Sequence, residues 1–547
     1  GWGDTCPWDH ADQCSDVFFF EMQICSREEL QPILQLKLNR AALDGRAPET
    51  YCKTYDLGIA NFVYSQPPLC EVAGLGYLTL SEGSVVGIHS SMDENGRAHA
   101  ERTKVYTEFG RQLQPKFPYF TDAVPFEHVG VHLSERTRDV YAGENTSQYL
   151  ASPVGAMQIL AESQMTYGIV LDRSMSDAAA LTRHPVLVLA NSASMTEAEA
   201  EAIRQYVADG GCLLATGETS LYDEHDQFRG QFLLEDVLGV RFAGVSPRQE
   251  TVATTPSFSR WPFLLRQHAL TEGLQDRMIT NVPWYDVAAA DDRDVIATWA
   301  ELRPDTDFCC VNGGMEIIGD SGAPAIVAGQ YGRGRVVYCA ADLTGRYMFE
   351  MNRHIRGLVA SMLRWLGPPP VVADTPSHVH FAVTAQPRES RLILHMVNIL
   401  YRGKSANEIL GHGFPYDPQA ALKRLGIAPA ARSGRPEVPD DLAGVIADYR
   451  TKHHRFEADH TCAGREGMYP FDEVIPLLDL RVRIDASAWP FTRAVDIDTG
   501  EDLSYTQAEG IRDIVIDRLD LYKGIALDVP ASCMPTHCRK DHRPFTY

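Results

Sequence analysis

The feature that most constrains the fold is a strand–helix–strand unit within residues 186–217. Residues 186–190 form a short aliphatic run, which is typical of a strand buried on both faces. Thr196 and Glu199 have the spacing of a capping box, so a helix should begin between them. The glycines at 210–211 favour its end, and a second apolar run follows at once. This order predicts a βαβ unit with parallel strands and a right-handed crossover.

Similar alternations of strand and helix signals precede this unit. The sequence predicts strands at 17–20, 50–55 and 84–88, and helices at 27–43 and 98–113, while residues 69–81 are helical or mixed. Three β–α repeats of this kind suit an α/β barrel or an open sheet. Because a closed barrel needs eight such units, three of them cannot close one.

The remainder of the chain divides into two further parts. Residues 114–126 contain three prolines and no periodicity, which indicates a linker. A second α/β series then follows, with a strand at 129–133, a helix at 153–164 and a long closing helix at 346–366. In the tail we expect a small β-sandwich, with strands at 378–384, 391–397, 479–484, 512–517 and 524–529. Residues 402–470 have no clear pattern.

Composition excludes several classes of protein. A net charge of −23 argues against nucleic acid or an anionic membrane as partner. No apolar run approaches the roughly 20 residues of a membrane span, and the first residues do not resemble a signal peptide. Twelve cysteines in 547 residues are too few for a disulfide scaffold. We therefore expect a cytoplasmic protein whose thiols stay reduced.

The order of parts resembles that of the family-42 β-galactosidases and related glycoside hydrolases. Five segments carry this resemblance: 185–191, the capped helix with its glycines at 210–211, 332–338, 363–365 and 391–398. The middle part is similar to the β-galactosidase trimerisation domain of that family, which has the class I glutamine amidotransferase fold. The resemblance implies the C-terminal portion of a (β/α)8 barrel at 1–113, a flavodoxin-like, doubly wound domain at 127–368 and a β-sandwich domain at 369–547.

The same resemblance implies a glycoside hydrolase that needs no cofactor. It also sets a limit, because residues 1–113 resemble only the last barrel units, and the family's acid/base residue is expected on an earlier strand. The chain is then a fragment, works with another chain that carries the missing strands, or has lost catalysis. The rival hypothesis is accordingly a non-catalytic carbohydrate-binding or assembly subunit.

Candidate site residues follow from the predicted strand ends. A retaining glycosidase needs two carboxyl groups about 5 Å apart at the carboxyl ends of barrel strands. Glu21 ends the first predicted strand and Asp56 follows the second, so these two are the catalytic candidates. His89 could bind a sugar hydroxyl. Trp2, Trp8 and Tyr55 could stack on a sugar ring. The alternatives are a salt-bridged strand-edge carboxylate for Glu21 and core packing for each aromatic residue.

Two other kinds of site are disfavoured. Cys6, His10 and Cys14, with Cys25 further on, are spaced more widely than the usual zinc pairs, and we expect no metal site there. A second Cys/His group lies in the tail, at Cys533, His537, Cys538 and His542, and is interpreted in the same way.

Amidotransferase chemistry would require a nucleophile on a Gly-x-Cys-x-Gly turn. The turn after residues 186–190 instead carries Ser192 and Ser194 without flanking glycines. The middle domain is therefore expected to be structural or to mediate oligomerisation. An unpaired parallel sheet edge also invites pairing with another chain. We expect a homo-oligomer, or a complex with a chain that carries the missing barrel strands.

Overall fold

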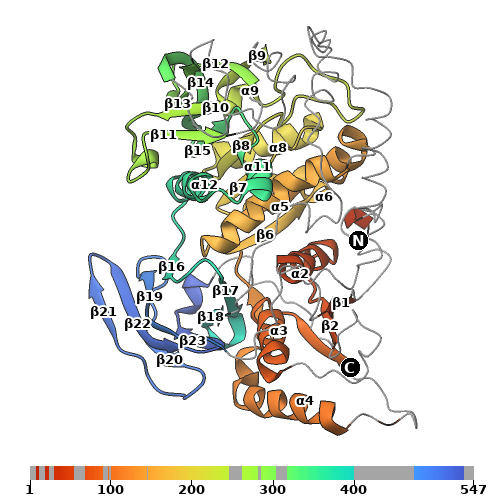
Figure 1. Ribbon diagram of the computed structural model, residues 1–547, viewed down its shortest axis with the longest axis vertical. Coiled ribbons are helices and arrows are strands. Elements are labelled where there is room, and N and C mark those ends of the chain that lie inside the picture. Colours follow the sequence, from red (N-terminus) through yellow and green to blue (C-terminus); the bar gives the residue numbers. More distant parts are fainter. Residues whose placement is uncertain are drawn as a thin grey trace, which may run out of the picture.

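The computed structural model describes residues 8–10, 19–23, 30–53, 68–89, 97, 100–143, 146–245, 261–280, 285–302, 317–398 and 474–534. Three parts are visible in Figure 1: a small α/β part at the lower right, a large α/β part at the top, and a β part at the lower left. None of the helices that the structure describes is long and apolar enough to cross a bilayer.

The first part contains the three β–α units that the sequence predicts. Its parallel strands lie in chain order, β1 (Phe19–Gln23), β2 (Glu49–Lys53) and β3 (Val85–His89). The helices are α2 (Leu30–Ala42), α3 (Leu69–Ser81) and α4 (Ala100–Leu113). One detail of the prediction is wrong: Glu21 is the third of the five residues of β1, not its end. Main-chain pairing with β2 continues to Gln23, and it does not depend on the apolar side chains that guided the prediction.

Residues 114–126, which the sequence suggests as a linker, are structured. They form the 3-10 helix η2 (Gln114–Tyr119) and the short strand β4 (Val124–Pro125). Strand β4 pairs with β17 (Val379–Gln386) of the third part, and the Phe126 amide continues the pairing by donating to the Val383 carbonyl over 2.8 Å. This segment therefore completes a sheet whose other strands lie more than 250 residues further on in the chain.

The second part is built on a mixed sheet of nine strands in the order β11-β10-β13-β14-β15-β8-β7-β5-β6. Its parallel half has the flavodoxin-like order and consists of β5 (Val129–Leu133), β6 (Tyr167–Leu171), β7 (Val186–Leu189), β8 (Cys212–Thr216) and β15 (Gly334–Cys339). The antiparallel half is β14 (Ile317–Tyr331), β13 (Asp294–Leu302), β10 (Trp261–Leu265) and β11 (Arg277–Thr280). Strands β9 (Val240–Val245) and β12 (Tyr285–Ala289) form a separate pair.

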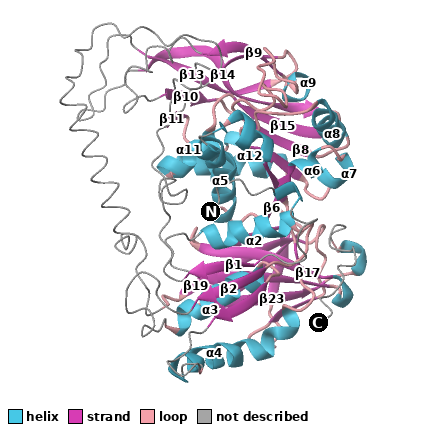
Figure 2. Cartoon of the chain, turned by 90° about the vertical axis from the view of Figure 1, so that its right-hand side faces the viewer, coloured by secondary structure: helices cyan, strands magenta, loops and turns pink. Residues whose placement is uncertain are grey.

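Helices cover both faces of the parallel half, as Figure 2 shows. On one face lie α5 (Thr146–Glu162), α11 (Leu343–Glu350) and α12 (Arg353–Leu366); on the other lie α6 (Asp172–Met175), α7 (Ala178–Leu181) and α8 (Glu197–Ala208). A short helix, α9 (Glu235–Leu238), packs near β9 and β15. The predicted βαβ unit is confirmed as β7, α8 and β8, and the capping box of Thr196 and Glu199 is present.

The closing helix is not continuous, contrary to the prediction for 346–366. Met351 has a left-handed backbone with φ 46°, which ends α11, and the Asn352 side chain accepts the His354 amide to begin α12. The sequence does not reveal this break, because apolar residues keep their helical spacing on both sides of it and each helix keeps an inward-facing apolar surface.

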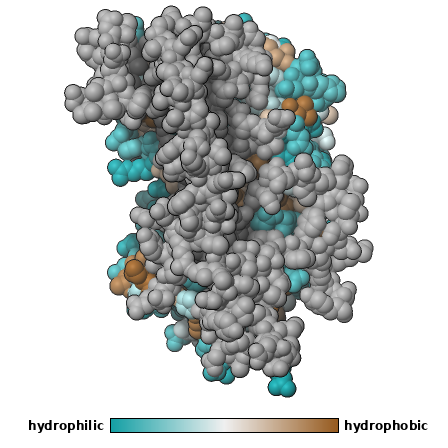
Figure 3. Space-filling view, turned by 45° about the vertical axis from the view of Figure 1, so that its right-hand side comes forward, coloured by the Kyte–Doolittle hydropathy of each residue, from teal (hydrophilic) through white to brown (hydrophobic). Residues whose placement is uncertain are grey.

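Figure 3 shows the outer surface on one side of the molecule, where the described residues are mostly hydrophilic with small, separate apolar areas.

The third part is the predicted β-sandwich. One sheet has the order β16-β19-β22-β21 and the other β20-β23-β18-β17-β4. The strands not yet given are β16 (Val371–Asp374), β18 (Arg391–Asn398), β19 (Leu477–Asp485), β20 (Arg493–Asp496), β21 (Tyr505–Ala508), β22 (Ile511–Leu519) and β23 (Tyr522–Asp528). Buried residues of both sheets, among them Val482, Ile514 and Leu394, form one hydrophobic core.

The three parts meet at the buried carboxylate of Glu82, just after α3. The Lys37 ammonium of α2 lies 2.7 Å from one carboxylate oxygen, and His380 Nε2 of β17 lies 3.0 Å from the other. The same ammonium lies 4.6 Å from the ring centre of Tyr167, in β6 of the second part. Burial alone would raise the pKa of Glu82, but Lys37 and His380 outweigh it and lower the pKa to about 2.

Candidate functional site

The first candidate site is the carboxyl edge of the three-stranded parallel sheet. Glu21 lies in β1, opposite Tyr51 of β2, which in turn pairs with Gly87 of β3. His89 is the last residue of β3. The side chains of Glu21 and His89, and the whole of Trp2, Tyr55 and Asp56, lie outside the described part of the structure. Their roles therefore stay predictions.

Trp8 is described, and its surroundings are those of a packed residue. Its side chain is only 5 % exposed, and the Arg138 guanidinium lies 4.1 Å from the centre of one of its rings. The Trp8 amide donates to the Glu135 carboxylate. The ring face under Arg138 is thus occupied by a cation–π contact with the second part of the molecule, where a sugar cannot stack.

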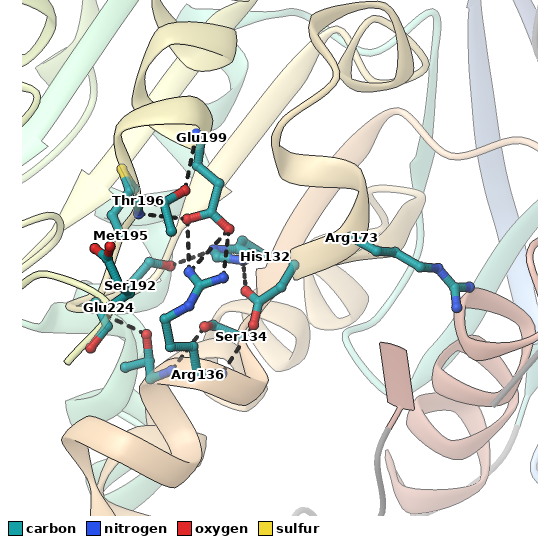
Figure 4. A network of polar contacts seen from close by, with 12 residues as sticks. His132, Ser134, Arg136, Arg173, Ser192, Met195, Thr196, Glu199 and Glu224 are labelled. Atoms are coloured by element: carbon teal, nitrogen blue, oxygen red, sulfur yellow. Dashed lines mark hydrogen bonds and ion pairs between the residues drawn. The ribbon is translucent and has the colours of Figure 1, made fainter. Parts of the chain in front are cut away.

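A second group of polar side chains lies at the carboxyl edge of the nine-stranded sheet (Figure 4). His132 lies in β5, while Asp172 follows β6 and Ser192 follows β7. His132 Nε2 is 2.9 Å from Asp172 Oδ1, and its Nδ1 is 2.9 Å from Ser192 Oγ. The order β7-β5-β6 makes this edge a topological switch point, where open α/β sheets commonly bind ligands.

Charge is balanced within this group. Burial by itself would raise the pKa of Asp172, but the hydrogen bond to the His132 ring and the hydrogen bond from the Arg136 amide outweigh it, so the net shift is downward. The Arg136 guanidinium binds both carboxylate oxygens of Glu199, at 3.0 and 2.7 Å from Nη1. Glu199 also accepts a hydrogen bond from the Thr196 amide, as the second member of the capping box of α8. The same carboxylate therefore stabilises the start of α8 and, through Arg136, the turn that follows β5.

Ser192, His132 and Asp172 are connected as in a serine hydrolase, but their geometry differs in two respects. The serine contacts Nδ1 and the carboxylate contacts Nε2, the reverse of the usual arrangement. Ser192 is 0 % exposed and His132 2 % exposed. In this arrangement the Ser192 hydroxyl is buried beside the ring of His132 and is not open to solvent.

Sequence reasoning considered Ser192 but missed His132 and Asp172. A signal was present, because both residues lie where neighbouring parallel strands end, and such ends meet at one edge of a sheet. The strand order was needed to bring Ser192 to the same histidine. Cys212 and Cys339 are free and buried, as expected for thiols that pack as small hydrophobic groups.

Comparison with known proteins supports the resemblance inferred from the sequence. Residues 165–359 match the family model described as the Beta-galactosidase trimerisation domain. Among solved structures, α-L-fucosidase isoenzyme 2 from Paenibacillus thiaminolyticus is similar with a TM-score of 0.61 and 15% identity, over 89% of this chain and 61% of that one. No curated protein matches the sequence.

Two β-galactosidase structures are similar over 95% of this chain. One, from Bacillus circulans sp. alkalophilus, has a TM-score of 0.57, 13% identity and 61% of its own chain covered. The other, a catalytic mutant of a GH42 enzyme from G. stearothermophilus, has a TM-score of 0.56, 12% identity and 60% covered. The chain therefore spans about three fifths of each of these structures. It shares their fold: barrel units, a trimerisation-type domain and a β-sandwich.

Proposed function

We propose that the protein is a glycoside hydrolase, or the part of one that carries Glu21 as a catalytic carboxyl group. The observation that carries this proposal is the position of Glu21 in β1, the first of three parallel β–α units that precede a trimerisation-type domain. Catalytic residues of α/β barrels come from such strands. The similar solved structures include β-galactosidases and an α-L-fucosidase, so a galactoside or fucoside is the substrate class to test first.

The chemistry requires a second carboxyl group. In a retaining enzyme the two groups lie about 5–5.5 Å apart, and in an inverting enzyme about 6.5–9.5 Å apart. Asp56, which follows β2, is the candidate within this sequence. Alternatively, the second group comes from barrel strands carried by another polypeptide or by a longer form of this one. In either case His89, Tyr55 and Trp2 would bind the sugar.

The second candidate function is an assembly subunit without activity of its own. It is favoured by the match of residues 165–359 to a trimerisation domain. Both functions predict self-association or a partner chain, because the matched family is a trimerisation domain. Light scattering after size-exclusion chromatography should then give a mass above that of the 60.7 kDa chain. A peak at the single-chain mass that persists at high concentration would contradict this expectation.

The decisive experiment measures hydrolysis of nitrophenyl β-galactoside and α-fucoside by the purified protein and by Glu21→Gln. Loss of a catalytic carboxyl group should lower kcat/KM at least about a hundredfold. Glu49→Gln, at the first residue of β2, is the matched control and should retain activity, because Glu49 pairs with Phe19 at the amino end of the sheet, two positions before Glu21. Equal turnover by wild type and Glu21→Gln would refute the role of Glu21. No turnover by wild type would favour the assembly subunit.

A further inference from the structure

The short 3-10 turn η1 (Trp8–His10) lies against the second part of the molecule, beside α6 (Figure 1). The residues that hold it come from two loops. Glu135 and Arg138 follow β5, and Arg173 follows β6. Both loops leave the carboxyl edge of the nine-stranded sheet, next to the switch point where doubly wound folds commonly bind ligands. This chain therefore places a turn of its own backbone at that edge.

Arg138 holds the side chain of Trp8. The Asp139 carboxylate binds one edge of the Arg138 guanidinium, with 2.5 Å between Nε and Oδ1 and 2.8 Å between Nη2 and Oδ2. The guanidinium carbon lies 4.1 Å from the centre of a Trp8 ring. Both side chains are buried, so water does not weaken this cation–π contact, and such contacts are strongest when they are desolvated.

The backbone of the turn is fastened to both loops. On the side of β5, the Glu135 carboxylate accepts hydrogen bonds from the amides of Trp8 and Asp9. On the side of β6, Arg173 Nη1 donates to the Asp9 carbonyl oxygen over 2.9 Å, and the Arg173 amide donates to Asp9 Oδ1 over 3.4 Å. Figure 4 shows the Arg173 side chain reaching away from His132, to where it meets this turn.

Like charges meet where the turn is fastened. Burial raises the pKa of Asp9, and the nearby charge of Asp172 raises it further. The amide and the guanidinium of Arg173 oppose this shift but do not cancel it. Burial also raises the pKa of Glu135, and the charge of Asp9 adds to that shift. The ionised forms of Asp9 and Glu135 therefore weaken the contact of the turn with this edge.

We propose that η1 is a strap that closes the carboxyl edge of the nine-stranded sheet beside Asp172 and, when released, opens this edge to solvent. In the closed state, the chain's own backbone lies where doubly wound folds commonly bind a ligand. Two opposing effects set the balance: the contact of Trp8 with Arg138 closes the strap, and the charge of Asp9 favours its release. The strap is independent of the glycosidase function proposed above, because none of these residues belongs to the three-stranded sheet.

Hydrogen exchange of the full chain at pH 7, measured at residue resolution by mass spectrometry, tests this proposal. The Arg136 amide is the reporter, because it donates to Asp172 Oδ2 over 3.0 Å at the edge that the strap closes. Its exchange is read relative to that of the amides of β8, which report global stability. Trp8→Ala should speed this relative exchange at least about tenfold, through loss of the cation–π contact and of the buried ring. Asp9→Asn should slow it about two- to fivefold, because it removes a repelling charge and keeps an acceptor for the Arg173 amide.

Trp365→Ala is the matched control. It breaks another contact between a tryptophan and an arginine of the second part, in which the Arg335 guanidinium carbon lies 5.2 Å from the ring centre. Because Trp365 lies on α12, on the opposite face of the sheet from α6, its loss should leave the relative exchange of the Arg136 amide unchanged.

Equal relative exchange in wild type and Trp8→Ala would overturn the proposal. Faster exchange in Trp8→Ala that the amides of β8 match would do the same, since it would report a loss of global stability and not release of the strap. Asp9→Asn keeps the buried ring and its contact with Arg138, so it decides the question even where Trp8→Ala does not fold. Relative exchange in Asp9→Asn that is as fast as in wild type, or faster, would contradict the strap.

Discussion

Removal of the buried carboxylate charge of Glu82 should destabilise the folded protein strongly, and Glu82→Gln tests this. Its pKa falls from 4.5 to about 2 in the folded protein. A shift of that size corresponds to roughly 3 kcal/mol of stability at neutral pH. Removal of one partner from a buried ion pair typically costs about 3–5 kcal/mol, because the other charge stays buried. Both arguments predict that Glu82→Gln lowers the free energy of unfolding at neutral pH by about 3 kcal/mol or more.

The pH dependence of this loss follows from the direction of the shift. A carboxyl group whose folded pKa is lowered stabilises the fold above its unfolded pKa, and this contribution disappears as pH falls through the folded pKa. For Glu82 the window runs from pH 4.5 down to about 2. The difference in unfolding free energy between wild type and Glu82→Gln should be constant above about pH 5.5 and shrink below about pH 4.5.

Urea unfolding followed by fluorescence and by circular dichroism, at a series of pH values, measures this difference. Glu272→Gln is the matched control: the residue is exposed, and the change should alter stability by no more than about 0.5 kcal/mol. A Glu82→Gln protein within about 1 kcal/mol of wild type at pH 7 would show that Lys37 and His380 do not hold the junction in this manner.

Three local changes give further checks by thermal or urea unfolding. Thr196→Ala removes one half of the capping box of α8 and should cost about 1 kcal/mol. Gly155→Ala, in α5, should cost about 1–3 kcal/mol or more, because a Cβ there would lie 2.0 Å from the Thr344 carbonyl oxygen at the contact with α11. The same substitution at Gly110 in α4 meets nothing within 4 Å and should stabilise the helix by up to about 1 kcal/mol. Equal effects at the two glycines would mean that the α5–α11 contact is looser than described.

Local sequence was sufficient for elements whose signals lie within a few residues of each other. The capping box of Thr196 and Glu199, the glycine stop of α8 and the flanking aliphatic runs specify the βαβ unit, because each interaction is made within one turn or one strand. Residues 69–81, which the sequence indicates as helical or mixed, form the helix α3 (Leu69–Ser81). The fold class of each of the three parts, and their order along the chain, follow from such elements.

Tertiary structure decided what joins these elements. The sequence contains nothing local that assigns β4 to the sandwich, breaks the closing helix at Met351, or brings Ser192 to His132. Glu82 has its partners 45 residues earlier and almost 300 residues later in the chain. Such contacts depend on strand order and on how whole surfaces pack, and these arise only when distant segments bury their apolar faces against one another. For that reason the βαβ unit could be predicted from the sequence, while the charged junction at Glu82 could not.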